Sequence, residues 1–238
     1  MKNFSLALGV AALVAVLAGC SGGGGSTSQL PTTGSGLNPG VRNARWFTYY
    51  FTSPSSIAKH AAVTVYGQTS FAFKPSTYTA LLVTADQTLT GDLTTKTLTD
   101  AVSVSGGKKA HYDFTGSYGS PSSYACNDND LPPNVRFFIN SGSPIFNFTR
   151  YWWSNPVSWD LAGPSGNGTT LTQLVNDPAD WSDWAGHPGN YDPGTMRRFL
   201  GAIKHVRYVG LSFGCGFGFE NGVTVKTGRT VFNSTFTE

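Results

Sequence analysis

The sequence predicts an all-β protein whose exported domain is an antiparallel β-sandwich with one short helix near residues 193–204. Three observations carry this prediction. Residues of alternating polarity recur along the chain, and clusters of Gly, Pro, Asn and Ser separate the alternating stretches. Only 12% of residues are charged while 13% are aromatic, a composition typical of extracytoplasmic β proteins and not of cytosolic helical ones.

Nine stretches alternate with the two-residue period of a half-buried strand. They are residues 45–51, 62–66, 78–83, 95–105, 135–140, 146–153, 157–161, 206–213 and 230–236. Many short strands at this spacing favour a sandwich or a barrel.

One stretch has a helical period. Asp192 can accept the first free backbone N–H groups of a helix, and Pro193 suits its first position. Apolar residues then recur on one face: Met196, Phe199, Leu200 and Ile203. We therefore expect a single helix over about 193–204.

The N-terminus resembles the leader of a bacterial lipoprotein. Lys2 precedes residues 4–18, which carry no charge and form an apolar run too short for a comfortable membrane span. The run ends in Leu17-Ala18-Gly19-Cys20, which resembles the lipobox that lipoprotein signal peptidase cleaves. The resemblance implies removal of residues 1–19 and lipidation of Cys20. The alternative is an ordinary signal peptide with a chance cysteine.

A tether follows the lipobox. Residues 20–38 are rich in Gly, Ser and Thr and cannot bury a core, so we expect a flexible linker ahead of a domain over 39–238. The expected location is the cell envelope. Ser21 does not match the aspartate of an inner-membrane retention signal, which favours an outer membrane if the cell has one.

The net charge and the cysteines limit which partners and cross-links the sequence predicts. The net charge is +3 without basic clusters, so nucleic acid is not an expected partner, and the expected membrane contact is the lipid on Cys20. Cys126 and Cys215 would form a disulfide in an oxidising compartment, or remain two separate buried thiols. No cysteine or histidine spacing matches a zinc site, so no metal site is predicted.

The second half of the chain resembles a galactose-binding-like jelly roll of the kind found in carbohydrate-binding modules. The resemblance lies in four segments, residues 135–139, 151–156, 181–184 and 206–222. It implies a jelly-roll sandwich and polysaccharide as a partner, and it carries over no individual sugar-contacting position.

Catalytic patterns are weak. Residues 210–214 match GxSxG, but Ser212 lies inside an alternating apolar run and no helix can follow it. Glu220 is the only interior glutamate, so a glycosidase would need a pair of aspartates. No cofactor is predicted, although Asp128 and Asp130 offer oxygen ligands for a structural calcium as an alternative to a solvated turn.

Aromatic residues supply the candidate ligand site. Five of the six tryptophans fall between 152 and 184, and strand alternation places Trp152 and Trp159 in the core. If the three strands 135–140, 146–153 and 157–161 share a sheet, the opposite face combines rings with polar groups: Arg136, Asn140, Tyr151, Trp153 and Asp160. Trp181 and Trp184 lie in a loop and complete the candidate set. The alternative is that all the strand tryptophans are core.

We therefore expect a membrane-anchored, non-catalytic polysaccharide-binding lipoprotein. Rings offer flat platforms to the C–H faces of sugars, while amide, carboxylate and guanidinium groups bond hydroxyls. The first alternative is a structural or protein-interaction surface lipoprotein. The second is a small glycan hydrolase or lyase.

Overall fold

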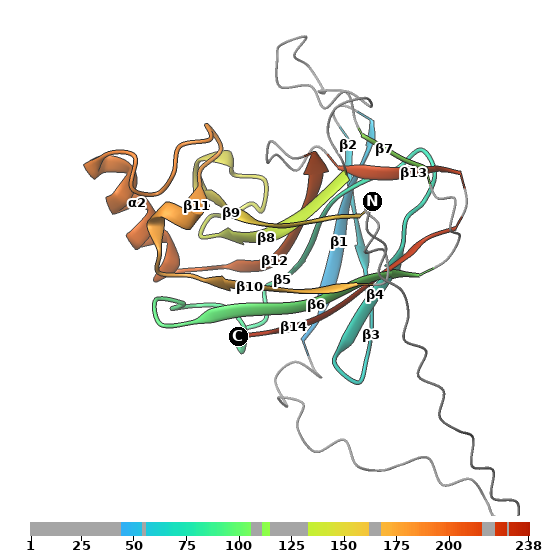
Figure 1. Cartoon of the computed structure of the whole chain (residues 1–238), viewed down its shortest axis with the longest axis horizontal. Helices are drawn as coiled ribbons and strands as arrows, with labels where there is room; N and C mark the ends of the chain where they lie inside the picture. The colour runs from blue at the N-terminus through green and yellow to red at the C-terminus, as the bar shows by residue number, and fades with distance from the viewer. Residues whose placement is uncertain are drawn as a thin grey trace, which may run out of the picture. The chain divides into compact units, whose positions relative to one another are not determined.

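The computed structural model describes residues 44–53, 56–105, 111–114, 133–161, 168–215, 222–227 and 229–238. These residues form two antiparallel β-sheets that pack face to face, with one α-helix, as the sequence predicted (Figure 1). All of them belong to one compact unit, Gly36–Glu238. The predicted leader, Cys20 and the tether lie outside the described residues.

The larger sheet has nine strands within the described residues, in the order β11-β9-β8-β12-β5-β1-β2, with β13 joining β5 to β7. Its strands are β1 (Trp46–Ser53), β2 (Ser56–Ala61), β5 (Tyr78–Thr84), β7 (His111–Phe114), β8 (Pro133–Asn140), β9 (Tyr151–Asp160), β11 (Trp181–Ser182), β12 (Tyr208–Cys215) and β13 (Val223–Thr227).

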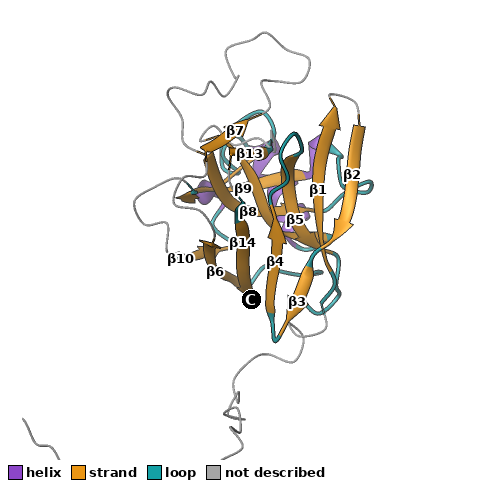
Figure 2. Cartoon of the chain, turned by 90° about the vertical axis from the view of Figure 1, so that its right-hand side faces the viewer, coloured by secondary structure: helices purple, strands orange, loops and turns teal. Residues whose placement is uncertain are grey.

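The smaller sheet has the order β10-β6-β14-β4-β3. Its strands are β3 (Val63–Val65), β4 (Gln68–Ala72), β6 (Thr97–Ser105), β10 (Thr169–Leu174) and β14 (Val231–Thr237). Figure 2 shows β3 beside β4 at one edge of this sheet.

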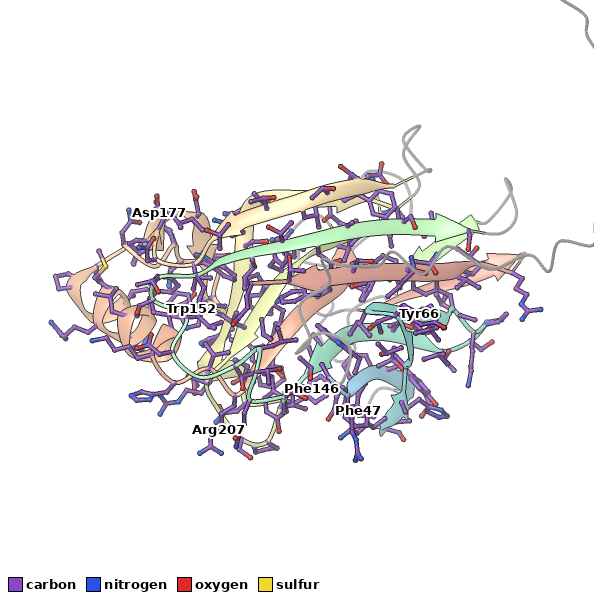
Figure 3. The ribbon with its side chains drawn as sticks, turned by 90° about the horizontal axis from the view of Figure 1, so that it is seen from below. Phe47, Tyr66, Phe146, Trp152, Asp177 and Arg207 are labelled. Carbon is purple, nitrogen blue, oxygen red and sulfur yellow. The ribbon has the colours of Figure 1, made fainter. Side chains whose placement is uncertain are left out.

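The main core lies between the sheets and is built from alternate residues of each strand. Phe137 of β8 meets Phe236 of β14 edge to face, with ring centroids 5.9 Å apart. Trp152, labelled in Figure 3, and Trp159 belong to this core. The prediction that these two tryptophans are core residues is confirmed.

The predicted strand 146–153 is wrong in its first half. Residues 148–150 form a short 3-10 helix, η1 (Phe148–Arg150), and β9 begins only at Tyr151. Local hydrogen bonds explain the difference, because Asn147 N–H donates to the carbonyl of Pro144 and Arg150 N–H to that of Asn147. These turn bonds use the N–H groups of Asn147 and Arg150 locally, so these two groups do not form ladder bonds with a neighbouring strand.

The predicted strands 146–153 and 157–161 are joined in one strand, β9, by an irregularity opposite Arg136–Phe138. The Ser154 hydroxyl spans it, since its Oγ donates to the carbonyl of Val157 at 2.7 Å and accepts from the N–H of Phe137 at 3.0 Å. The side chain thus replaces the missing ladder bonds.

The predicted helix is confirmed as α2 (Pro193–Ile203). The Asp192 carboxylate accepts from the N–H of Thr195 at 2.6 Å, and Pro193 occupies the first turn. Phe199 and Ile203 are buried as expected, whereas Leu200 is 41% exposed. The helix docks by a narrower stripe than predicted, made of Thr195, Phe199, Ala202 and Ile203. It lies at one end of the sandwich near β11 and β9 (Figure 1).

Candidate functional site

The predicted polar–aromatic face exists as a set of neighbours on β8 and β9. Asn140 pairs with Tyr151 and Phe138 pairs with Trp153 across the two strands. Tyr151 and Trp153 lie on the opposite face from Trp152, as alternation predicted. The expectation that this face forms an exposed platform is wrong, because Tyr151 is 0% and Trp153 only 1% exposed.

A second apolar cluster explains this burial. The outer face of the large sheet gathers Leu81, Phe138, Tyr151 and Trp153, and the turn after β8 adds Ile145 to it. The rings pack edge to face, with centroids 5.0 Å apart for Phe138–Tyr151 and 5.5 Å for Tyr151–Trp153. Their faces are used in packing, so they are unavailable to a sugar.

Among the polar residues of the predicted face, Asn140 has a structural role. Asn140 is fully buried, and its amide donates to the carbonyl of Ile145 at 2.6 Å while its oxygen accepts from the N–H of Gly142. It holds the turn that brings Ile145 onto the sheet. Arg136 is buried, and desolvation lowers the pKa of its guanidinium to about 10. Asp160 is half-buried at the end of β9.

The two loop tryptophans separate into an anchor and an exposed ring. Trp181 is buried, and its indole N–H donates to the carbonyl of Leu174 at 3.1 Å. The expectation that Trp181 contacts ligand is therefore wrong, because both the ring and its only donor are used inside the protein. Trp184 is 50% exposed and is the one predicted ring that a ligand can reach.

Trp184 sits at the tip of a tight hairpin, residues 181–189. The hairpin is closed by Gly189 N–H to the carbonyl of Trp181 at 2.7 Å and by Asp183 N–H to the carbonyl of His187 at 2.9 Å. Gly186 at the tip has φ +80°, a conformation that glycine adopts without a steric cost. The chain can therefore reverse within three residues and project Trp184 outward.

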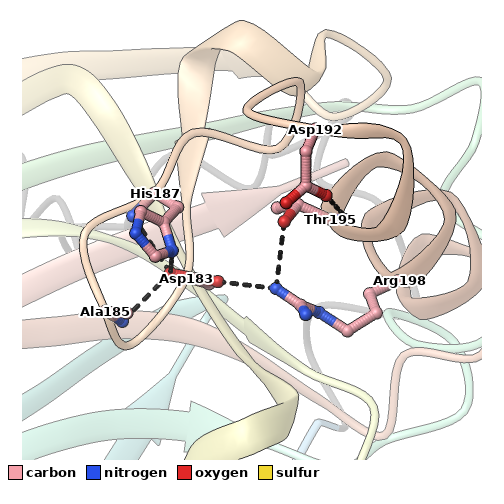
Figure 4. Close-up of polar contacts among 6 residues, drawn as sticks. All are labelled: Asp183, Ala185, His187, Asp192, Thr195 and Arg198. Carbon is pink, nitrogen blue, oxygen red and sulfur yellow. Dashed lines mark hydrogen bonds and ion pairs between the residues drawn. The ribbon is translucent and has the colours of Figure 1, made fainter.

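Asp183 fixes this hairpin to α2 (Figure 4). Its buried carboxylate accepts from the N–H groups of Ala185 and His187, both at 3.0 Å, and from Nη2 of Arg198 at 2.9 Å. Charge-assisted bonds to one carboxylate hold the loop backbone and the helix in one arrangement. The residue next to Asp183 in the chain is Trp184, so the exposed ring projects from a rigid base.

A second exposed ring follows the hairpin. Tyr191 is 60% exposed, and its ring stacks on that of His187 with centroids 4.2 Å apart and planes 15° from parallel. The sequence analysis missed both residues, because a loop has no regular period from which its exposed and buried side chains can be predicted. The position of Tyr191 directly before the helix cap Asp192 was the available signal. The 183–191 segment thus presents flat rings on a constrained backbone.

The described residues were also searched for a metal site and for acidic pockets. No group of three or more His, Cys, Asp and Glu side chains among them could hold a metal ion. Three pockets lined by described residues have no carboxylate in their lining. Cys126, Asp128 and Asp130 lie outside the described residues, so the disulfide to Cys215 and the calcium alternative stay predictions.

No described helix has the length and apolar character needed to cross a membrane.

Fold and site together define an all-β sandwich protein with an aromatic hairpin joined to α2, the one α-helix among the described residues. No protein-family model, curated protein or solved structure matches the chain. The resemblance to a galactose-binding-like jelly roll therefore stays a prediction beyond the sandwich itself.

Proposed function

We propose that the protein is a non-catalytic glycan-binding lipoprotein, anchored through Cys20, that engages polysaccharide with the hairpin 181–189. The observation that carries the proposal is the contrast between an exposed ring and a buried, hydrogen-bonded base within this hairpin. Trp184 is half exposed, while its base is fixed by the buried Asp183 and Trp181.

The chemistry of sugars suits such a ring. Pyranoses present apolar C–H faces that lie flat on indole and phenol rings, and a ring fixed in advance loses little conformational entropy on binding. Tyr191, stacked on His187, offers a second flat surface in the same segment. The aromatic faces on β8 and β9 play no part in this site, because they are buried.

Replacing Trp184 with alanine tests the site. We expect binding of the full-length chain to polysaccharide to weaken about tenfold, because a stacked ring contributes on the order of 1–2 kcal/mol. The melting temperature should stay nearly unchanged, since exposed side chains contribute little to stability. A polysaccharide array followed by titration calorimetry on the best ligand measures both the ligand and the loss.

Tyr66→Asn is the matched control. Tyr66 is an exposed ring at the β3–β4 turn, and its φ of 52° suits asparagine. It should bind polysaccharide as the wild-type chain does. Equal binding by Trp184→Ala and wild type, or no array signal for the wild type, would refute the proposal.

The anchoring part of the proposal rests on the lipobox alone. Mass spectrometry of the mature N-terminus tests it, with a lipid-modified Cys20 as the expected result. An unmodified Cys20 or a cleavage elsewhere would remove the anchor and leave the binding site untouched.

Protein interaction is a second candidate function, favoured by a different surface. The edge strand β3 exposes Val63 and Val65, and Tyr66 follows them at the turn. Exposed apolar edge strands can pair with a strand of another chain. Two results together would support this candidate in place of the first. The wild-type chain would bind no polysaccharide, and Tyr66→Asn would lose binding to a protein partner.

A further inference from the structure

A small cavity lies where α2 meets the start of β9. Its volume is about 250 Å³, and its lining combines an apolar part, Trp152 and Ala202, with hydroxyl groups and two guanidinium groups. The polar members are Ser141, Thr149, Arg150 and Arg198. A cavity lined by two cations and no anion selects for a negatively charged group.

The aliphatic part of the Arg150 side chain packs against the backbone and holds the residue in place. The residue ends η1, and its aliphatic carbons lie against Gly142, where an added Cβ would come within 2.7 Å of Cγ. Glycine is therefore needed at 142 for this arrangement. No acidic side chain pairs with Arg150 within the described part of the chain. Its charge is available to a ligand.

Arg198 is oriented from the other side of the cavity. Its Nη2 donates to the Asp183 carboxylate at 2.9 Å and to the Thr195 hydroxyl at 3.2 Å, which fixes the plane of the guanidinium. Asp183 neutralises one of the two cations of the cavity, so the cavity keeps a net positive charge. The ion pair of Arg198 with Asp183, drawn in Figure 4, connects a residue of the cavity lining to the hairpin that carries Trp184.

Ser141 provides an independent indication of a ligand. Its Oγ is shielded from solvent and has no hydrogen-bond partner among the described residues, although it lines the cavity. A shielded hydroxyl without a partner carries a free-energy cost that a bound acceptor would remove. Among the described residues, this hydroxyl is thus a donor without an acceptor.

We propose that this cavity binds the carboxylate of an acidic sugar, which makes uronate-containing polysaccharides the ligand class. The inference rests on the proposed function, because the cavity would bind a carboxylate of the same glycan whose ring stacks on Trp184. A planar carboxylate matches the fork of a guanidinium and can accept from the Ser141 hydroxyl as well.

Paired ligands and paired variants test the inference. The full-length chain is titrated with oligogalacturonate, with its carboxyl-reduced neutral counterpart and with a sulfated neutral oligosaccharide. We expect the wild type to bind oligogalacturonate about tenfold more tightly than the reduced form, the ratio typical of one charge-assisted contact. Arg150→Gln should remove this preference, and Arg150→Lys should restore only part of it, because lysine keeps the charge and loses the fork.

Arg197→Gln is the matched control. Arg197 lies beside Arg198 on α2, is exposed, and does not line the cavity, so its loss changes the net charge equally. It should keep the preference. Equal losses in Arg150→Gln and Arg197→Gln, or tighter binding of the sulfated oligosaccharide than of oligogalacturonate, would overturn the carboxylate site. Tight binding of the neutral form without preference would overturn it and leave the proposed function intact, whereas no binding of any glycan overturns both.

Discussion

Replacing Phe199 with alanine is expected to lower the free energy of unfolding by about 3–5 kcal/mol. Phe199 is fully buried, and its ring contacts Trp152 of β9 at a centroid distance of 5.0 Å and Trp181 of the hairpin at 6.4 Å. It also fills the space against Gly189, where an added Cβ would lie 3.0 Å from its Cγ. One ring therefore joins the helix, the sheet and the hairpin, and its loss leaves a cavity among all three.

Denaturant unfolding of Phe199→Ala and of Leu200→Ala measures this effect. Both substitutions truncate a large apolar side chain to alanine at adjacent helix positions, but Leu200 is exposed and its loss should cost less than about 1 kcal/mol. We also expect Phe199→Ala to weaken glycan binding, because the hairpin loses its support. Similar stabilities for the two variants would show that α2 does not dock through Phe199.

Stability is expected to fall by roughly 2–3 kcal/mol between pH 5 and pH 8 because of Asp100. Its carboxyl group is fully buried in the small sheet, and desolvation raises its pKa to about 7, although the Ser234 hydroxyl bonds both of its oxygens, at 2.8 and 3.0 Å. The unfolded chain loses this proton near pH 4, while the folded chain keeps it until about pH 7. Folding therefore binds a proton in this window, and rising pH removes the stabilisation.

Asp100→Asn isolates the effect. The amide has the same shape, can still accept from Ser234 and does not titrate, so the variant should show a nearly constant free energy of unfolding from pH 5 to pH 8. Asp92 and Asp192 do not contribute in this window, because hydrogen bonds from Thr94 and Thr195 lower their pKa values further below it. Parallel pH profiles for wild type and variant would contradict the assignment.

The fold could be predicted from sequence because the signals for it are local. Alternation marked β5, β6, β8, β12 and β14, and the Asp192-Pro193 pair marked the start of α2. Strands without strong apolar alternation were not predicted. β10 is mostly Thr and Gln, and β2 has hardly any buried side chain to give it a period. β9 was divided because its irregularity depends on one hydroxyl, that of Ser154.

The candidate site was harder to predict, for a physical reason. Alternation tells which residues share a face, and it correctly separated Trp152 from Tyr151 and Trp153. It does not tell what covers that face. The turn that places Ile145 there is held by Asn140, a residue that looked like a ligand contact. The hairpin that carries Trp184 is joined to α2 by a bond from Arg198 to Asp183, and Arg198 lies fourteen residues beyond Trp184 in the chain.

Tryptophan oxidation tests the central claim most directly. Five of the six tryptophans are buried, and Trp184 is 50% exposed. The full-length chain is treated with limiting N-bromosuccinimide, with and without the polysaccharide that binds best on the array, and the modified residue is located by mass spectrometry. We predict oxidation of Trp184 before any other tryptophan, and its protection by bound polysaccharide. Oxidation of Trp184 at the same rate in the saturated complex would contradict the account, because a ring covered by a sugar cannot react as a free one does.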